Sequence, residues 1–262
     1  MDTVRKAPHD ARAKLNLANW YIGGKKYKKA LVLCQQAENL SDRETSVNTT
    51  VPIALNLRGT IAYEQDKPEK AATYFQQAYS LRKDYTAVAE KLIATLVELE
   101  RYDEALAVIT ERYAIKNDAS LLLLKASVFL RQGKPTEALA TYRQAELFYQ
   151  ALPLVMTGKA KAFIMKGNHD QAAPLLVRAA RQNDAIAMLL QIENNLLSGQ
   201  ESEASVQLKK LVEKIPLVRL LNDLNAAEKD PFQIPLDRTL LRQAILHTAV
   251  LMLSGSQKEE TL

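Results

Sequence analysis

Apolar residues recur along most of the chain at intervals of three and four, which is the period of one face of an α-helix. In residues 133–145, GKPTEALATYRQA, the apolar positions Ala138, Tyr142 and Ala145 lie on one helical face. Pro135 falls in the first turn, where a residue without an N–H group is tolerated. We therefore expect a helix that begins near Pro135.

A second apolar series precedes this helix. Leu122, Ala126 and Phe129 share one face, and Gly133 ends the series at a position typical of a helix C-terminus. Two amphipathic helices joined by a turn of a few residues pack against each other as an antiparallel hairpin. The sequence thus predicts a helical hairpin over residues 118–150.

The second half of this hairpin recurs six times along the chain. Successive copies start 41, 34, 33, 34 and 32 residues apart, at Lys25, Asp66, Glu100, Gly133, Gly167 and Gly199. A repeat period in this range is typical of a solenoid, in which each unit packs on its neighbours. The longest interval contains the polar stretch 41–50, SDRETSVNTT, which predicts a longer loop after the first unit.

Small residues lie at a fixed spacing inside the repeat. Four small residues of first helices each precede an alanine of the second helix by 12 positions: Ala18 and Ala30, Gly59 and Ala71, Ala126 and Ala138, Ala160 and Ala172. Helices approach closely only where side chains are small, so these pairs predict the line of contact in each hairpin.

This pattern resembles the tetratricopeptide repeat (TPR) family over roughly residues 10–216. Stretches such as LANWYIGGKKYKKALVLCQQA and ASVFLRQGKPTEALATYRQA carry a small residue, an aromatic residue, a turn and an Ala–aromatic–Ala series in order. The third and sixth units depart from it, because Ile93 replaces the small residue and Asn195 the aromatic one. The resemblance places the units near residues 10–42, 51–83, 85–117, 118–150, 152–183 and 184–216.

We therefore expect an all-α fold, a right-handed α-solenoid of about six TPR-like hairpins over residues 1–216. Another helical solenoid of similar period is the alternative. Residues 217–254 predict a helical cap, in which Asp237 precedes a helix that runs to about Leu253. The alternative for this helix is that it fills a concave groove of its own or of a neighbouring chain. Residues 255–262 predict a disordered tail.

Charge is unevenly distributed along the chain. The net charge is +5, and residues 1–29 hold eight lysines and arginines against two aspartates. This basic end predicts contact with an anionic partner, either an acidic protein or a lipid surface. Only Trp20, Tyr21 and Tyr27 accompany the charges, and no recognised motif is present, so nucleic acid is not expected. The sequence contains no apolar run long enough to span a membrane.

Catalytic and metal chemistry is not predicted. His9, His169 and His247 lie far apart in different units, and together with the single cysteine, Cys34, they show no metal-ligand spacing. No glycine-rich phosphate loop, nucleophile elbow or carboxylate pair stands out. We expect no enzyme activity, no cofactor and no metal, and a buried structural role for Cys34.

In TPR proteins the first helices of successive units line a concave surface that binds proteins or peptides. The resemblance therefore implies a non-catalytic binding scaffold with a groove of mixed polarity, suited to a short peptide or helix. The implied groove residues are Leu15, Asn19, Ile22, Asn56, Thr60, Tyr63, Glu90, Ala94, Val97, Leu123, Ser127, Leu130, Leu154, Lys161 and Ile164.

One ligand mode of the family fits poorly. TPR co-chaperones hold a terminal carboxylate with a lysine and an asparagine on the first unit, an asparagine on the second and a basic pair on the third. Asn19 and Asn56 match, whereas Leu15 replaces the lysine, and Glu90 and Ala94 replace the basic pair. The charge of Glu90 would repel a carboxylate, so this mode is not expected.

The opening stretch DTVRKAPHDARAKLNLANWYI resembles the start of the TPR region in bacterial multi-pass membrane proteins related to O-mannosyltransferases. That resemblance implies a segment that follows a last membrane span, on the extracytoplasmic side. The domain would then present substrate or assist assembly of a membrane glycosyltransferase. The other hypotheses are a scaffold for a protein partner and a sensor domain for a small effector.

Overall fold

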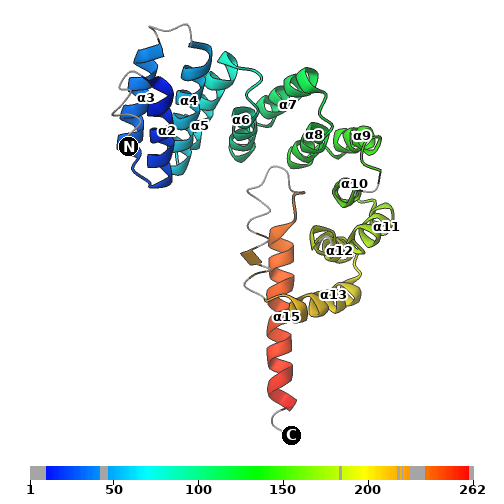
Figure 1. Cartoon of the computed structure of the whole chain (residues 1–262). Coiled ribbons are helices and arrows are strands. Elements are labelled where there is room, and N and C mark those ends of the chain that lie inside the picture. The colour runs from blue at the N-terminus through cyan, green and yellow to red at the C-terminus, as the bar shows by residue number, and fades with distance from the viewer. Residues whose placement is uncertain are drawn as a thin grey trace. The chain divides into compact units, whose positions relative to one another are not determined.

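The computed structural model describes residues 10–41, 47–150, 152–182, 185–216 and 234–259, and the single positions 219, 221, 222 and 224. Within these residues the chain forms thirteen helices and no strand (Figure 1). It divides into two compact units, Met1–Asn117 and Asp118–Leu262, at a boundary between two of the predicted repeats. Each unit is a stack of helical hairpins, which confirms the all-α solenoid; its right-handed sense stays a prediction.

The described part of unit 1 contains three hairpins. They are α2 (Ala11–Gly23) with α3 (Tyr27–Ser41), α4 (Val47–Glu64) with α5 (Pro68–Leu81), and α6 (Thr86–Glu98) with α7 (Tyr102–Lys116). Neighbouring hairpins touch through α3 with α4 and through α5 with α6.

The loop predicted over residues 41–50 is shorter than expected. Ser41 ends α3, and α4 already begins at Val47, whereas residues 42–46 lie outside the described part. Thr50 is 7% exposed, so packing of the first turn outweighs the weak helix propensity of its polar residues.

The described part of unit 2 contains three more hairpins and a last helix. The hairpins are α8 (Ser120–Arg131) with α9 (Pro135–Glu146), α10 (Pro153–Met165) with α11 (His169–Ala180), and α12 (Ala185–Leu197) with α13 (Glu201–Lys214). The last helix, α15 (Arg238–Glu259), contacts α12 and α13.

Small residues do line the contact inside the hairpins. The seven alanines of the predicted pairs are all fully buried. At Gly59, an added Cβ would lie 2.5 Å from Phe75 Cε1, and at Gly158 it would lie 2.1 Å from Tyr142 Cζ. Gly158 lies on α10 and Tyr142 on α9, so this second close approach joins two neighbouring hairpins.

The six turns inside the hairpins share one left-handed residue, and it is the first residue of each repeated phrase. Its φ is 55° at Lys25, 58° at Asp66, 56° at Glu100, 74° at Gly133, 72° at Gly167 and 77° at Gly199. The N–H group of the next residue bonds back into the helix, as from Lys134 to the Phe129 carbonyl at 2.9 Å. This Schellman-type ending explains the constant length of the turn.

The two atypical hairpins compensate in different ways. In α6 the bulky Ile93 is 2% exposed, and α6 and α7 lie close together over a shorter stretch than α4 and α5. In α12 the buried Asn195 donates from Nδ2 to Gln207 Oε1 on α13 at 3.2 Å. A polar bond thus replaces the aromatic contact of the other units.

The C-terminal helix is longer than predicted. Asp237 does cap it, because its Oδ1 accepts the Leu240 N–H at 3.0 Å. However, α15 continues to Glu259, so residues 255–259 of the predicted tail are helical, and 260–262 lie outside the described part. Gly255 is a residue typical of a helix C-terminus, but α15 continues through it to Glu259. No proline follows Pro235, and residues 257–259 are good helix formers.

Leu241 and Ile245 of α15 are fully buried, in one apolar cluster with Leu189, Ile192 and Leu208 of α12 and α13. The helix therefore covers the end of the last hairpin. Residues 217–233, the first part of the predicted helical cap, lie outside the described part except for positions 219, 221, 222 and 224.

Candidate peptide-binding faces

The predicted groove residues of α2, α4 and α6 form what we name the first-helix face of unit 1. Asn19, Tyr63 and Glu90 are exposed, Thr60 and Ala94 are half-buried, and Leu15, Ile22, Asn56 and Val97 are buried. The surface that a ligand can reach on this face is therefore mainly polar.

The corresponding residues of α8, α10 and α12 form the first-helix face of unit 2. Leu123 and Leu154 are half-buried, and Ser127, Leu130, Lys161 and Ile164 are buried. None of these six predicted groove residues is exposed, so the two faces differ in how much of the predicted groove a partner can reach.

Lys91 lies where α6 meets α4 on the first-helix face of unit 1. Its Nζ on α6 donates to Thr60 Oγ1 at 2.8 Å and to Asn56 Oδ1 at 3.2 Å, both on α4. Asn56 Nδ2 in turn donates to Tyr85 Oη at 3.4 Å. Burial lowers the pKa of Lys91, against the attraction of the Glu64 carboxylate. A partly dehydrated ammonium whose hydrogen-bond acceptors are neutral favours an additional anionic or carbonyl oxygen.

A second polar contact also joins α4 and α6. The Glu98 carboxylate on α6 accepts a hydrogen bond from Tyr63 on α4, and this contact, together with burial, raises the pKa of Tyr63 to about 12. The phenol is therefore neutral at physiological pH. The contact between α4 and α6 therefore presents a cation, amide and hydroxyl groups, and a carboxylate.

Unit 2 also has a lysine on its first-helix face, one helical turn nearer the hairpin turn than Lys91, and gives it a charged partner. Lys161 Nζ on α10 lies 2.5 Å from Glu193 Oε1 on α12, and the two residues are 8% and 1% exposed. The other oxygen of Glu193 accepts the backbone N–H of Asp237 at 2.9 Å. Ile234, just before α15, is fully buried in the same cluster as Ile164. Lys161 is therefore engaged inside the protein.

Sequence reasoning missed the residues that organise both faces. It assigned Glu90 and Ala94 to the groove and passed over Lys91, because its place beside Asn56 depends on how α6 packs on α4. Glu193 was not singled out either. A signal was available, since it sits within the apolar stretch AIAMLLQIENNLL, where a surface charge is unusual.

Other chemistry is sparse in the described part of the chain. No group of three or more His, Cys, Asp or Glu side chains there could hold a metal ion, and no helix there is long and apolar enough to cross a membrane. Cys34 is fully buried, as predicted, and burial raises the pKa of its thiol to about 12. His169 Nδ1 lies 2.9 Å from Asn194 Oδ1, whereas His9 lies outside the described residues.

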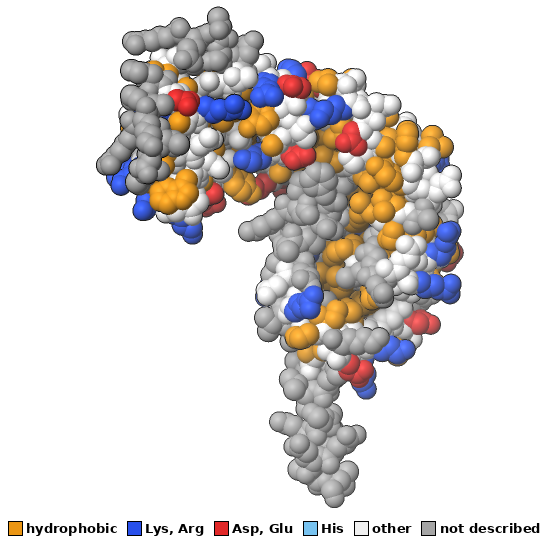
Figure 2. Space-filling view, viewed as in Figure 1, with side chains coloured by type: hydrophobic (Ala, Val, Ile, Leu, Met, Phe, Trp, Pro, Cys, Tyr) orange, Lys and Arg blue, Asp and Glu red, His pale blue; other side chains and the backbone are white. Residues whose placement is uncertain are grey.

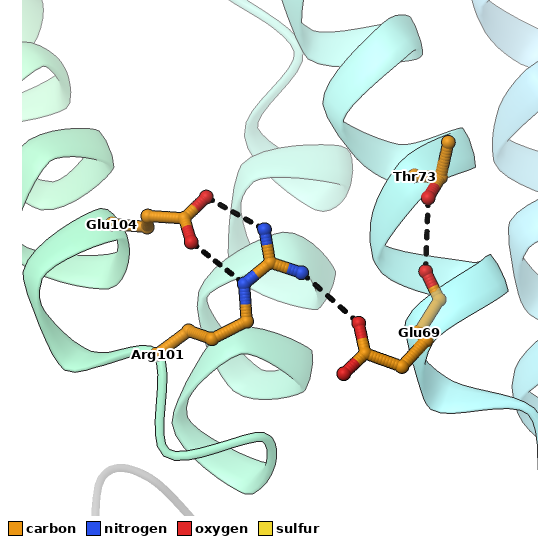
Figure 3. Close-up of polar contacts among 4 residues, drawn as sticks. All are labelled: Glu69, Thr73, Arg101 and Glu104. Carbon is orange, nitrogen blue, oxygen red and sulfur yellow. Dashed lines mark hydrogen bonds and ion pairs between the residues drawn. The ribbon is translucent and has the colours of Figure 1, made fainter.

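Ion pairs connect neighbouring hairpins in unit 1. Arg101 bonds to both oxygens of Glu104 at 2.7 Å and to Glu69 at 3.1 Å, which joins the first turn of α7 to that of α5 (Figure 3). These side chains are largely exposed, so each pair contributes about 1 kcal/mol or less to stability. We interpret the network as structural.

The basic end carries an exposed aromatic residue. Trp20 is 61% exposed, and Lys26 Nζ lies 5.9 Å from the centre of its ring. Lys29 lies over Tyr21 in the same way, at 5.8 Å. On the face shown in Figure 2, acidic and basic side chains are mixed along unit 1, and hydrophobic side chains gather over the helices of unit 2.

Comparison with solved structures supports the repeat fold. The chain is 18% identical to YrrB, described as a TPR protein with an unusual peptide-binding site, with a TM-score of 0.56 over 71% of this chain and 94% of YrrB. A tetratricopeptide repeat protein from Parabacteroides merdae matches at 13% identity, with a TM-score of 0.66 over 91% of this chain and 98% of its own. PilW, a type IV pilus biogenesis factor, matches at 20% identity, with a TM-score of 0.58 over 79% and 94%.

These identities establish the fold alone, and no curated protein sequence matches the chain. Tetratricopeptide repeat models match residues 9–84 and 91–153, which are 76 and 63 residues, or 139 of 262. Such repeats generally serve as protein-binding scaffolds, and the link to O-mannosyltransferases stays a prediction. With six hairpins in register and repeat models covering more than half of its length, the chain belongs to the tetratricopeptide repeat family.

Proposed function

We propose that the protein binds a peptide segment of a partner on the first-helix face of unit 1, with Lys91 as the polar anchor. The observation that carries this proposal is the partly buried ammonium of Lys91, whose hydrogen bonds in the described structure go to the neutral Asn56 and Thr60. An ammonium has three N–H donors, so one remains for a ligand oxygen.

The surroundings support a peptide rather than a small ion. Asn19, Tyr63 and Ala94 are exposed or half-buried near the same face, so a ligand can make both polar and apolar contacts. The helices are already held in place by the hairpin packing, so binding orders mainly the ligand. A peptide carbonyl or an acidic side chain would accept the third N–H of Lys91.

The test is a peptide selection followed by a single substitution. Peptides selected from a random library on the intact protein are labelled, and their affinities are measured by fluorescence anisotropy for wild type, Lys91→Met and Lys70→Met. Lys70 is the control, because it lies on α5 over the Tyr74 ring. We expect Lys91→Met to weaken binding at least tenfold and Lys70→Met to leave it unchanged.

Binding should also respond to pH in a defined direction. The folded protein has a lowered Lys91 pKa, so the ammonium is lost, and binding with it, as pH rises through a value below 10.5. Lys91→Met should show no such dependence. Peptides that bind wild type and Lys91→Met equally well would overturn the proposal.

The exposed Trp20 and its lysines favour a second function, contact with an anionic lipid surface. Indole rings and lysines are typical of the membrane interface, and each lysine near an anionic surface adds about 1 kcal/mol. We expect vesicles with phosphatidylserine to retain the protein and neutral vesicles not to. Trp20→Ala and Lys25→Gln should each reduce retention, whereas Leu81→Ala, another exposed apolar position, should not. Equal retention of the protein on both kinds of vesicle would exclude this second function.

A further inference from the structure

The four residues that precede α15 contact the first-helix face of unit 2. Residues 234–237 have no regular secondary structure, and Figure 1 shows them and the start of α15 on the side of unit 2 where α8, α10 and α12 lie. The contacts of this segment are therefore made with the part of the solenoid that the repeat pattern assigns to ligands.

The segment makes its apolar contacts through two side chains at alternate positions. Ile234 is fully buried and belongs to the cluster that contains Leu130, Ile164 and Leu190. Leu236 is partly buried and packs against that cluster and against the neighbouring one around α12 and α13. Both side chains pack on the same cluster, so Ile234 and Leu236 act as two apolar anchors.

The polar contact of the segment is made by its backbone. Glu193 Oε2 accepts the Asp237 N–H at 2.9 Å, and Glu193 Oε1 is held by Lys161. A buried ion pair adds little stability compared with apolar residues of the same size, so stability alone does not explain this pair. A carboxylate fixed to accept a backbone N–H suits any extended segment, because every residue except proline supplies that donor.

We propose that the inner face of α10 and α12 is a peptide-binding site, and that residues 234–237 are its built-in ligand. The ligand class is an extended segment with two apolar side chains at alternate positions, followed by a backbone N–H for Glu193. A partner segment of this chemistry enters by displacing residues 234–237. This site is separate from the Lys91 site of unit 1 and does not rest on it.

Displacement leaves the rest of the fold in place. The helix α15 has its own contacts, because Leu241 and Ile245 are buried against α12 and α13. Residues 234–237 compete only because they are tethered, which gives a short segment a high effective concentration. A substitution that weakens the tethered segment should therefore open the site to the same sequence added in solution.

The experiment uses a labelled peptide with the sequence of residues 234–240, IPLDRTL, and the intact protein. Fluorescence anisotropy measures its binding to wild type, to Ile234→Ala and to Ile234→Ala combined with Glu193→Gln. Val206→Ala is the matched control, since Val206 is 54% exposed on α13. Helical content by circular dichroism is recorded for every variant.

We expect Ile234→Ala to bind the peptide at least tenfold more tightly than wild type, and Val206→Ala to behave like wild type. The combined variant should return to weak binding. A folded Ile234→Ala protein that binds the peptide no better than wild type would overturn the proposal, as would Ile234→Ala losing its helical content. In both cases residues 234–237 are a fixed part of the core, and the Lys91 site is unaffected.

Discussion

The first-helix faces of the two units each contain a lysine with defined hydrogen-bond partners, and the partners differ. Lys91 in unit 1 bonds to the neutral Asn56 and Thr60, and burial lowers its pKa. Lys161 in unit 2 is buried against Glu193, beneath residues that precede α15. The same residue type on the same kind of helix thus bonds to neutral side chains in unit 1 and forms a buried ion pair in unit 2. The difference between the two lysines is the charge of their hydrogen-bond partners.

The turns of the two units differ as well, although their backbones agree. The left-handed residue is glycine at Gly133, Gly167 and Gly199 in unit 2, but it is a residue with a side chain in every turn of unit 1. A left-handed backbone costs roughly 1–2 kcal/mol for an L-residue other than glycine. Unit 1 therefore carries strain in its turns that unit 2 avoids.

The largest expected effect comes from removing each lysine in turn. Lys161→Met leaves Glu193 buried without its cation and should lower the free energy of unfolding by about 3–5 kcal/mol. Lys91→Met leaves its two neutral hydrogen-bond partners and the exposed Glu64, so it should cost about 1 kcal/mol or less. Urea unfolding followed by circular dichroism measures both. Equal losses would mean that the two lysines have equivalent environments.

A control on α10 separates burial from charge. Lys159 pairs with Glu146 at 2.9 Å, but Glu146 is 40% exposed. Lys159→Met should therefore cost about 1 kcal/mol or less. If it destabilised the protein as much as Lys161→Met, the loss would come from replacing any lysine on this helix.

The next effect concerns the close approach between two neighbouring hairpins, α9 of one and α10 of the next. Gly158→Ala would place a methyl group 2.1 Å from Tyr142 Cζ, so we expect a loss of about 1–3 kcal/mol and a lower melting temperature. Gly23→Ala is the control, because no atom lies within 4 Å of its added Cβ. A neutral Gly158→Ala would show that the α9–α10 packing adjusts without strain.

Exchanging the turn residues tests the difference between the units directly. Glu100→Gly should raise the free energy of unfolding by about 1 kcal/mol, because glycine removes the left-handed strain in unit 1. Gly133→Glu should lower it by a similar amount in unit 2. Thermal unfolding of the two variants measures both changes, and shifts of the same sign would contradict the explanation.

The smallest expected effect is that of Tyr142→Phe. The Tyr142 hydroxyl is buried without a hydrogen-bond partner among the described residues, so its removal should be neutral or stabilising by less than about 1 kcal/mol. Burial also raises the pKa of Tyr142 above the ordinary value of 10.0. The unfolded chain then loses this proton first as pH rises above 10. Stability should fall there more steeply in wild type than in Tyr142→Phe.

Several features were predictable from the sequence because they depend on local spacing. The period of the apolar residues predicted the hairpins, and the small residues at a spacing of 12 predicted where the helices touch. Pro135 and Asp237 predicted helix starts through their own backbone chemistry. The end of α15 was not predictable in the same way, because the helix continues through Gly255, a local stop signal just after Leu253.

The sequence by itself therefore determined the repeat, the hairpins and the burial of Cys34, since each follows from contacts between residues near one another in the chain. Only the tertiary structure decided the roles of Lys91 and Glu193. Lys91 meets Asn56 across 35 residues, and Glu193 meets Asp237 across 44. The environment of a charged side chain depends on which helices and segments pack around it, and no spacing within one helix encodes that.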